Sequence, residues 1–82
     1  FHPDSIVLDL AMGRSEGLQI VSNLRKNMNY DDVVIIGLAA EDEPNPDSLT
    51  ENGFNEVFKK PFDPALLTER LRTLIRQRKD LL

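Results

Sequence analysis

IVLDL, residues 6–10, is a short apolar run interrupted by a single carboxylate, that of Asp9. The run is too brief for a helix and does not alternate, which predicts a strand over residues 5–10 that is covered on both faces. A carboxylate at the carboxyl end of such a strand points into the crevice where open α/β sheets bind ligands. The same few residues therefore predict both a fold class and a site.

A lysine follows a later strand signal in a comparable position. The segment 55–59 predicts a short strand, and Lys60-Pro61-Phe62 comes directly after it. We expect the acid and the cation on adjacent strand ends, where Lys60 can stabilise charge that builds up on the carboxylate. That arrangement suits an aspartate that accepts a phosphoryl group.

The first half of the chain contains a second strand and a helix. Residues 33–38, VVIIGL, give the strongest strand signal and are apolar on both faces. A helix is expected over about 16–28, with Ser15 as its N-cap. Its buried stripe at helical spacing consists of Leu18, Val21, Leu24 and Met28.

A short helix is expected in the acidic, proline-rich segment that follows. Asn45 could cap it and Pro46 could be its first residue, where a missing N–H costs nothing. Gly53 is expected as its left-handed terminator. In that register Leu49 and Phe54 form the hydrophobic contact of a Schellman motif.

The last helix is expected to begin at Pro64, with Asp63 as its N-cap. Its apolar stripe consists of Leu67, Leu71, Leu74 and Ile75. The whole order is β-α-β-α-β-α, which predicts an α/β fold with a parallel sheet and right-handed crossovers.

Composition excludes several classes of protein. The chain has 82 residues, enough for one small domain, and no cysteine, so it has no disulfide or thiolate metal site. Its apolar runs are too short for a transmembrane helix, and its net charge of −4 argues against general nucleic-acid binding. These features fit a cytoplasmic protein. Because the chain begins with Phe1 rather than methionine, we expect a processed, truncated or excised chain.

The motifs together resemble the response-regulator receiver domain of two-component signalling. They are the VLDL strand with Asp9, EGL at 16–18, the turn at Gly53 and KPFDP at 60–64. The resemblance implies a partial flavodoxin-like receiver fold over residues 1–82, with family strands three, four and five alternating with three helices. The family's first strand, first helix, second strand and second helix are absent.

The resemblance also implies roles for individual residues. Asp9 matches the aspartate that takes a phosphoryl group from a sensor histidine kinase, and Lys60 matches the lysine that contacts this group. The Lys60–Pro61 bond is cis in the family. Asp9 and the backbone carbonyl of Ala11 match Mg²⁺ ligands, but the remaining acidic ligands lie in the absent first loop. We therefore expect Mg²⁺ to bind in the intact domain and poorly to these 82 residues alone.

Three positions depart from the family pattern. Ala39 stands where a serine or threonine hydroxyl is usual, Val57 replaces the switch aromatic, and Gly13 replaces a proline. A second hypothesis is therefore a degenerate receiver that acts as an interaction module without phosphorylation. A third, an aspartate phosphatase, needs a second aspartate where Ala11 stands, so the chain is not expected to be an enzyme.

Partners follow from these hypotheses. The receiver would work with a sensor histidine kinase and with an effector domain or partner protein, without membrane or direct nucleic-acid contact. Strand 5–10 would have an unpaired edge, so we expect a dimer or swapped assembly through these residues, or else a first half of the domain supplied by a separate segment. The acidic stretch 41–43 and the arginines Arg76 and Arg78 are expected to be solvated.

Overall fold

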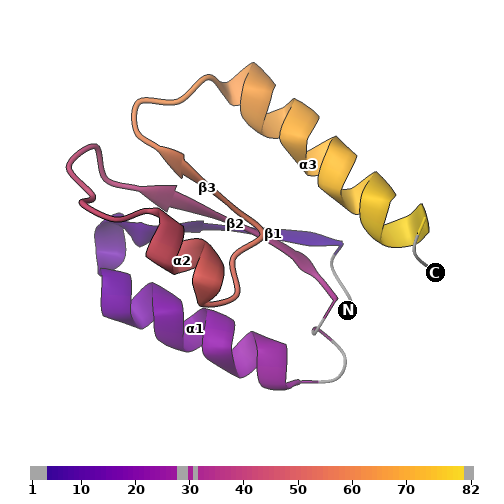
Figure 1. Ribbon diagram of the computed structural model, residues 1–82, viewed down its shortest axis with the longest axis horizontal. Helices are drawn as coiled ribbons and strands as arrows, with labels where there is room; N and C mark the ends of the chain where they lie inside the picture. Colours follow the sequence, from indigo (N-terminus) through magenta and orange to yellow (C-terminus); the bar gives the residue numbers. More distant parts are fainter. Residues whose placement is uncertain (1–3, 28–29, 31, 81–82) are drawn as a thin grey trace.

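A parallel sheet of three strands forms the centre of the molecule (Figure 1). The computed structural model describes residues 4–27, 30 and 32–80. The strand order is β1-β2-β3, so the middle strand separates the first from the last. The strands span Ser5–Asp9 (β1), Val34–Ala39 (β2) and Glu56–Lys59 (β3).

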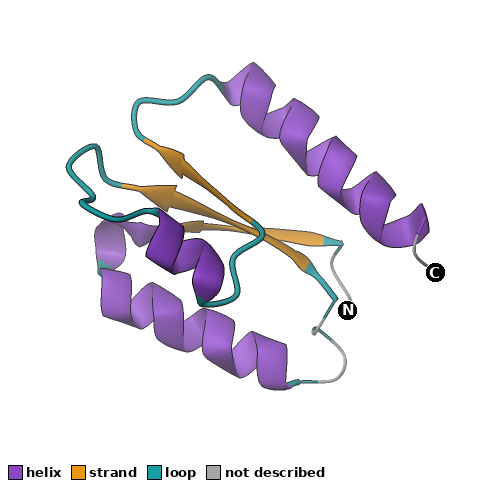
Figure 2. Ribbon diagram, viewed as in Figure 1, coloured by secondary structure: helices purple, strands orange, loops and turns teal. Residues whose placement is uncertain are grey.

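Helices cover both faces of this sheet (Figure 2). α1 and α2 lie on one face and α3 crosses the other, and all three strands end at the same edge, here called the carboxyl edge. A short 3₁₀ helix, η1, begins at that edge directly after β1. The helices span Leu10–Met12 (η1), Arg14–Lys26 (α1), Asp47–Glu51 (α2) and Pro64–Asp80 (α3). The α/β fold expected from the sequence is confirmed.

The core lies around β2, because this strand has neighbours on both sides and helices on both faces. Its side chains from Val34 to Ile36 are buried, which agrees with the unalternating apolar run. The main buried cluster consists of Leu10, Val21, Val33, Ile35, Ala39, Leu49 and Phe54. Leu18 and Leu24 of the expected α1 stripe pack against it, and Met28 lies outside the described residues.

The start of α1 differs from the expectation. The helix begins at Arg14, and its N-cap is Gly13, so the prediction that Ser15 is the cap was wrong. The N–H of Gly17 donates to the carbonyl oxygen of Gly13 at 3.2 Å, which closes the first turn two residues earlier. β1 also ends at Asp9, one residue earlier than expected, because Leu10 begins η1.

The end of α2 is a Schellman motif, as expected. The N–H of Phe54 donates to the carbonyl of Leu49 at 3.4 Å, and that of Gly53 donates to Thr50 at 3.3 Å. Gly53 has φ +111°, a conformation that side-chain-bearing residues rarely adopt. Leu49 and Phe54 are both buried in the core cluster. The motif therefore fixes the entry of the chain into β3.

The start of α2 is shifted by one residue. Pro46 is the N-cap position and the helix begins at Asp47, so the prediction that Asn45 caps it was wrong. The carbonyl of Asn45, not its side chain, accepts from the N–H of Ser48 at 3.3 Å. Because this turn closes through backbone groups, the side chain of Asn45 is not needed as a cap.

α3 begins as expected. Asp63 Oδ1 accepts from the N–H of Ala65 at 2.9 Å, and Pro64 is the first helical residue. The expected stripe of Leu67, Leu71, Leu74 and Ile75 is only half-buried. No helix in the described part of the chain is both long and apolar enough to span a membrane.

The far end of α3 is held by an ion pair that the sequence did not predict. Arg78 donates to the Asp4 carboxylate at 2.9 Å and to the Asp4 carbonyl at 3.1 Å. The prediction that Arg78 belongs to a solvated face was therefore wrong, whereas Arg76 is exposed. This contact ties the end of α3 to the start of β1.

Candidate functional site

The carboxyl edge brings Asp9 and Lys60 into direct contact. Lys60 Nζ lies 2.9 Å from Asp9 Oδ1 and 2.9 Å from Oδ2, so the ammonium bridges both carboxylate oxygens. The two side chains remain partly open to solvent, at 37% exposed for Lys60 and 47% for Asp9. The pair is therefore accessible to a reagent that approaches this edge.

The fold positions Asp9 through two adjoining elements. Asp9 is the last residue of β1 and also the N-cap of η1. Its Oδ1 accepts from the backbone N–H of Ala11 at 2.9 Å. This short-range hydrogen bond fixes the carboxylate at the point where the chain leaves the sheet.

Lys60 reaches the carboxylate from a strand that is not its neighbour. The prediction that the acid and the cation lie on adjacent strand ends was wrong, because β2 lies between β1 and β3. The N–H of Lys60 donates to the carbonyl of Ala39 at 3.0 Å, which places the lysine beside the end of β2. Its long side chain then spans the end of that strand, where Ala39 has only a methyl group. The Lys60–Pro61 bond is cis, as the resemblance implied.

The surroundings of Asp9 favour its ionised form. The backbone N–H of Ala11, followed by the Lys60 ammonium, holds the pKa of the Asp9 carboxyl below its usual value of 3.8. Partial desolvation acts in the opposite direction and is outweighed. Asp9 is therefore a carboxylate at neutral pH, the state required of an oxygen nucleophile.

Ala39 and Val57, two of the three positions that depart from the family pattern, make different contacts. Ala39 is the last residue of β2 and is fully buried. Val57 lies in β3, is half-buried and packs against the core cluster. At these positions the chain therefore offers a methyl group and an aliphatic side chain, without a hydroxyl or a ring.

Sequence reasoning missed a second cation at this edge. Arg14 Nε lies 3.4 Å from Glu43 Oε1, and Arg14 also donates to the Ser48 hydroxyl. The prediction that the acidic stretch 41–43 is solvated was wrong for Glu43, whose side chain is only 12% exposed. The position of Arg14 directly after the loop that follows Asp9 was the signal that could have indicated it.

A Mg²⁺ ion needs more oxygen donors than this site offers. The ion requires near-octahedral oxygen coordination, usually including waters and carboxylates. Within the described residues no cluster of three or more metal-ligating side chains occurs. The Asp9 carboxylate is already paired through both oxygens with Lys60. Asp9 and the Ala11 carbonyl alone therefore do not fit a Mg²⁺ site.

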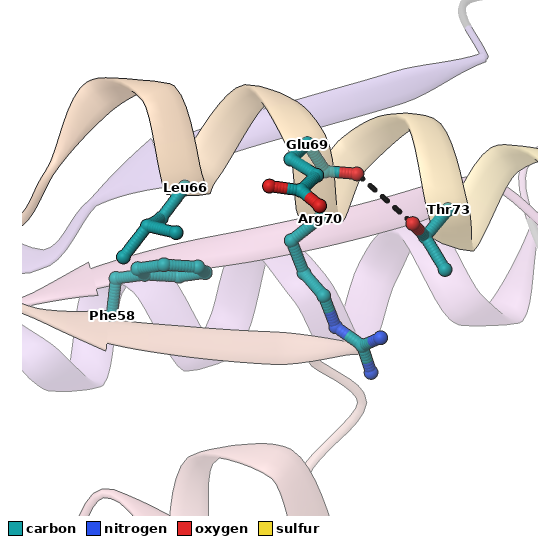
Figure 3. A pocket seen from close by; sticks show the side chains of 5 residues that line it. All are labelled: Phe58, Leu66, Glu69, Arg70 and Thr73. Atoms are coloured by element: carbon teal, nitrogen blue, oxygen red, sulfur yellow. Dashed lines mark hydrogen bonds between the residues drawn. The ribbon is translucent and has the colours of Figure 1, made fainter.

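A separate hollow of about 380 Å³ opens between β3 and α3 (Figure 3). Phe58 and Leu66 form its apolar part. Arg70 also lines the hollow, and its Nε lies 2.7 Å from Glu56 Oε2. Its lining consists of Phe58, Leu66, Glu69, Arg70 and Thr73. None of these residues belongs to the Asp9–Lys60 pair, so the hollow is distinct from the carboxylate site.

Known proteins with similar sequences include a histidine kinase and a response regulator. Over 78 residues the chain is 35% identical to the hybrid signal transduction histidine kinase D of Dictyostelium discoideum, a match covering 94% of this chain and 5% of that protein. It is also 35% identical over 79 residues to the response regulator MprA of Mycobacterium avium, covering 95% and 34% respectively. The chain therefore spans about a third of MprA and far less of the kinase.

Solved structures show the same fold. A response regulator signal receiver domain from Bermanella marisrubri superposes with a TM-score of 0.73 and 27% identity, covering 89% of this chain and 61% of that one. The family model of the response regulator receiver domain matches residues 1–72, most of the chain. With the flavodoxin-like arrangement and the acid–lysine pair in place, the chain belongs to the response regulator receiver domain family.

Proposed function

We propose that this chain is the phosphoacceptor module of a two-component response regulator and takes a phosphoryl group on Asp9 from a sensor histidine kinase. The observation that carries the proposal is the contact of Lys60 Nζ with both Asp9 oxygens at the carboxyl edge. Open α/β sheets bind their ligands at this edge. A carboxylate that only capped a loop would not need a cation held from two strands away.

The proposed step is a direct displacement at phosphorus. One Asp9 oxygen attacks the phosphorus of the donor's phosphohistidine, the P–N bond breaks, and the imidazole nitrogen keeps the electron pair. The product is an acyl phosphate on Asp9. Oδ1 accepts from Ala11 as well as from Lys60, whereas Oδ2 accepts from Lys60 alone within the described part of the chain. Oδ2 is therefore the freer nucleophile.

Lys60 would neutralise charge throughout this step. Its ammonium lies against the carboxylate before transfer, and the negative charge that develops on the phosphoryl oxygens appears close to it. The chain would accept the group rather than catalyse a reaction of its own. It would act in the cytoplasm and pass its state to an effector domain or partner protein. Where the whole protein uses Mg²⁺, acidic groups from outside these residues would have to complete the site.

A degenerate, phosphorylation-independent module is the second candidate. Ala39 favours it, because this residue offers no hydroxyl to a phosphoryl group. The retained Asp9–Lys60 contact favours the phosphoacceptor, because an interaction module has no need of an ionised, lysine-paired carboxylate. We therefore prefer the first proposal.

Phosphoryl labelling tests the choice. The full-length protein is incubated with radiolabelled acetyl phosphate in Mg²⁺ buffer, and the label is expected on Asp9 as a hydroxylamine-labile acyl phosphate. Asp9→Asn should remove the label, because an amide is a poor nucleophile. Asp63→Asn, at the N-cap of α3, is the matched control and should keep it. A folded wild-type protein that takes no label would favour the degenerate module.

We also propose that β1 pairs with a further strand, supplied either by a second copy of these 82 residues or by a separate segment. This strand lies at the edge of the sheet and, in the described part of the chain, pairs only with β2. Val7 in its middle is 41% exposed. Exposed apolar edges invite pairing with another chain. If a second copy supplies the strand, sedimentation should show a concentration-dependent dimer that Val7→Lys weakens, and a monomer at all concentrations would contradict pairing between copies.

A further inference from the structure

We propose that Arg14 is a movable cation of the Asp9 site. Glu43 and Ser48 hold it while Asp9 is a free carboxylate, and it transfers to the phosphoryl group when Asp9 is phosphorylated. The transfer releases the first turn of α2, so phosphorylation of Asp9 changes the conformation at the start of α2. This inference rests on the proposed function and adds a regulatory contact to it.

The resting position of Arg14 is defined by a small polar network. Arg14 contacts Glu43 and Ser48. The Ser48 hydroxyl in turn donates to the Asn45 carbonyl at 2.9 Å. The N–H of Asn45 donates to Glu43 Oε1 at 3.4 Å. One guanidinium thus links the start of α1 to the loop after β2 and to the first turn of α2.

The same arginine is closely linked to Asp9 along the chain. Asp9 caps η1, and the N–H of Gly13 closes this helix on Leu10 at 3.1 Å. Arg14 is the next residue and begins α1. Asp9 and Arg14 therefore flank one hydrogen-bonded turn at the carboxyl edge, and a change at the carboxylate acts directly on the segment that carries the guanidinium.

The phosphoryl group is the stronger partner for a guanidinium. Glu43 offers one negative charge, whereas a phosphorylated side chain carries a charge of about −2 and three acceptor oxygens. Arginine presents its N–H groups in a fork that matches such oxygens. The resting pair is weakened by solvent, since the Arg14 side chain is 45% exposed. An exchange of partners is therefore favourable.

The site offers few hydrogen-bond donors to a phosphoryl group on Asp9. Lys60 supplies one ammonium, and Ala39 supplies no hydroxyl where the resemblance implies one. A ligand shifts a conformational equilibrium only through contacts that differ between the two states. Transfer of Arg14 provides such a difference, because the network at Glu43 and Ser48 is intact in one state and broken in the other.

Beryllofluoride, which mimics a phosphoryl group on a carboxylate, provides the test. The full-length protein is titrated with it in Mg²⁺ buffer while the amide resonances of Asp9, Glu43 and Ser48 are recorded. In the wild type we expect the Ser48 signal to shift together with that of Asp9. Arg14→Gln should weaken binding about fivefold, equivalent to about 1 kcal/mol, and should abolish the Ser48 shift.

Two further variants keep the test decisive if Arg14→Gln does not fold. Glu43→Gln removes the competing carboxylate and should tighten binding about twofold. Arg14→Lys retains the charge without the fork and should give an intermediate affinity. Arg72→Gln, which removes an exposed arginine of α3, is the matched control and should behave as the wild type.

The outcomes separate this inference from the proposed function. If the wild type binds the mimic at Asp9 and the Arg14 and Glu43 variants bind it equally well, the movable cation is refuted while the phosphoacceptor stands. If the folded wild type shows no change at Asp9, both are refuted. A Ser48 shift that persists in Arg14→Gln would also overturn the inference.

Discussion

Replacing Lys60 with methionine is expected to slow phosphoryl transfer to Asp9 by about 10²–10³-fold, the usual cost of removing one preorganised charge-stabilising donor. The ammonium bridges both carboxylate oxygens at 2.9 Å, so it already lies where charge develops on the incoming group. Methionine retains the length of the side chain and removes its charge. The rate of label incorporation from acetyl phosphate measures the effect.

Variants at Lys59 and Lys60 separate the specific role of the Lys60 ammonium from a general effect of positive charge. Lys59→Met removes one positive charge from the preceding residue, which is exposed, and should leave the rate within about twofold because exposed charges interact weakly. Lys60→Arg should recover only part of the rate, because the planar guanidinium of arginine cannot take the place of a single ammonium nitrogen between the two Asp9 oxygens. Equal rates for Lys60→Met and the wild type would rule out this role.

The same variant has a second readout in the acidity of Asp9. Lys60→Met should raise the pKa of Asp9 towards 3.8, although not completely, because the N–H of Ala11 still lowers it. Since the pKa is depressed in the folded state, the contribution of Asp9 to stability is present above 3.8 and is lost as pH falls through the lower folded value. An NMR titration of the Asp9 side-chain carboxyl carbon, in the wild type and in Lys60→Met, measures the pKa of Asp9 in each protein.

The sequence predicted the backbone features that depend on local patterns. The apolar run of β2 and the Schellman motif at Gly53 each need only a few consecutive residues, and both were confirmed. Asp9 and Lys60 could also be predicted to meet, because parallel strands end at one edge of a sheet. Their separation by β2 was missed because strand ends alone do not give the order of strands.

The long charged side chains could not be placed in this way. Arg78 binds Asp4, a residue 74 positions away, and Arg14 binds Ser48, 34 positions away. Such side chains have many rotamers, and their partners are set by tertiary distance rather than by spacing along the chain. The N-cap of α1 was missed for a related reason. Ser15 is a good N-cap by type, but the backbone of Gly13 closes the first turn before it.

The largest expected effect on stability is at Phe54, where Phe54→Ala should lower the free energy of unfolding by about 3–5 kcal/mol. Phe54 is 3% exposed and closes the Schellman motif of α2. Its ring also fills the space beside Gly37 in β2, where an added Cβ would lie 2.8 Å from Phe54 Cε1. The substitution removes a large side chain that this packing cannot replace. Urea denaturation followed by circular dichroism measures the loss.

A double-mutant cycle with Gly37 isolates the ring contact from general loss of hydrophobic area. Gly37→Ala alone should cost about 1–3 kcal/mol, because the new methyl group collides with the ring. In the Phe54→Ala background the same methyl group enters the vacated space, so its cost should fall by about 1–2 kcal/mol. Ile20→Ala, at an exposed position in α1, is the control and should change stability little. If the two core substitutions add without coupling, Phe54 does not fill the space beside Gly37, and its contribution to stability must come from other contacts.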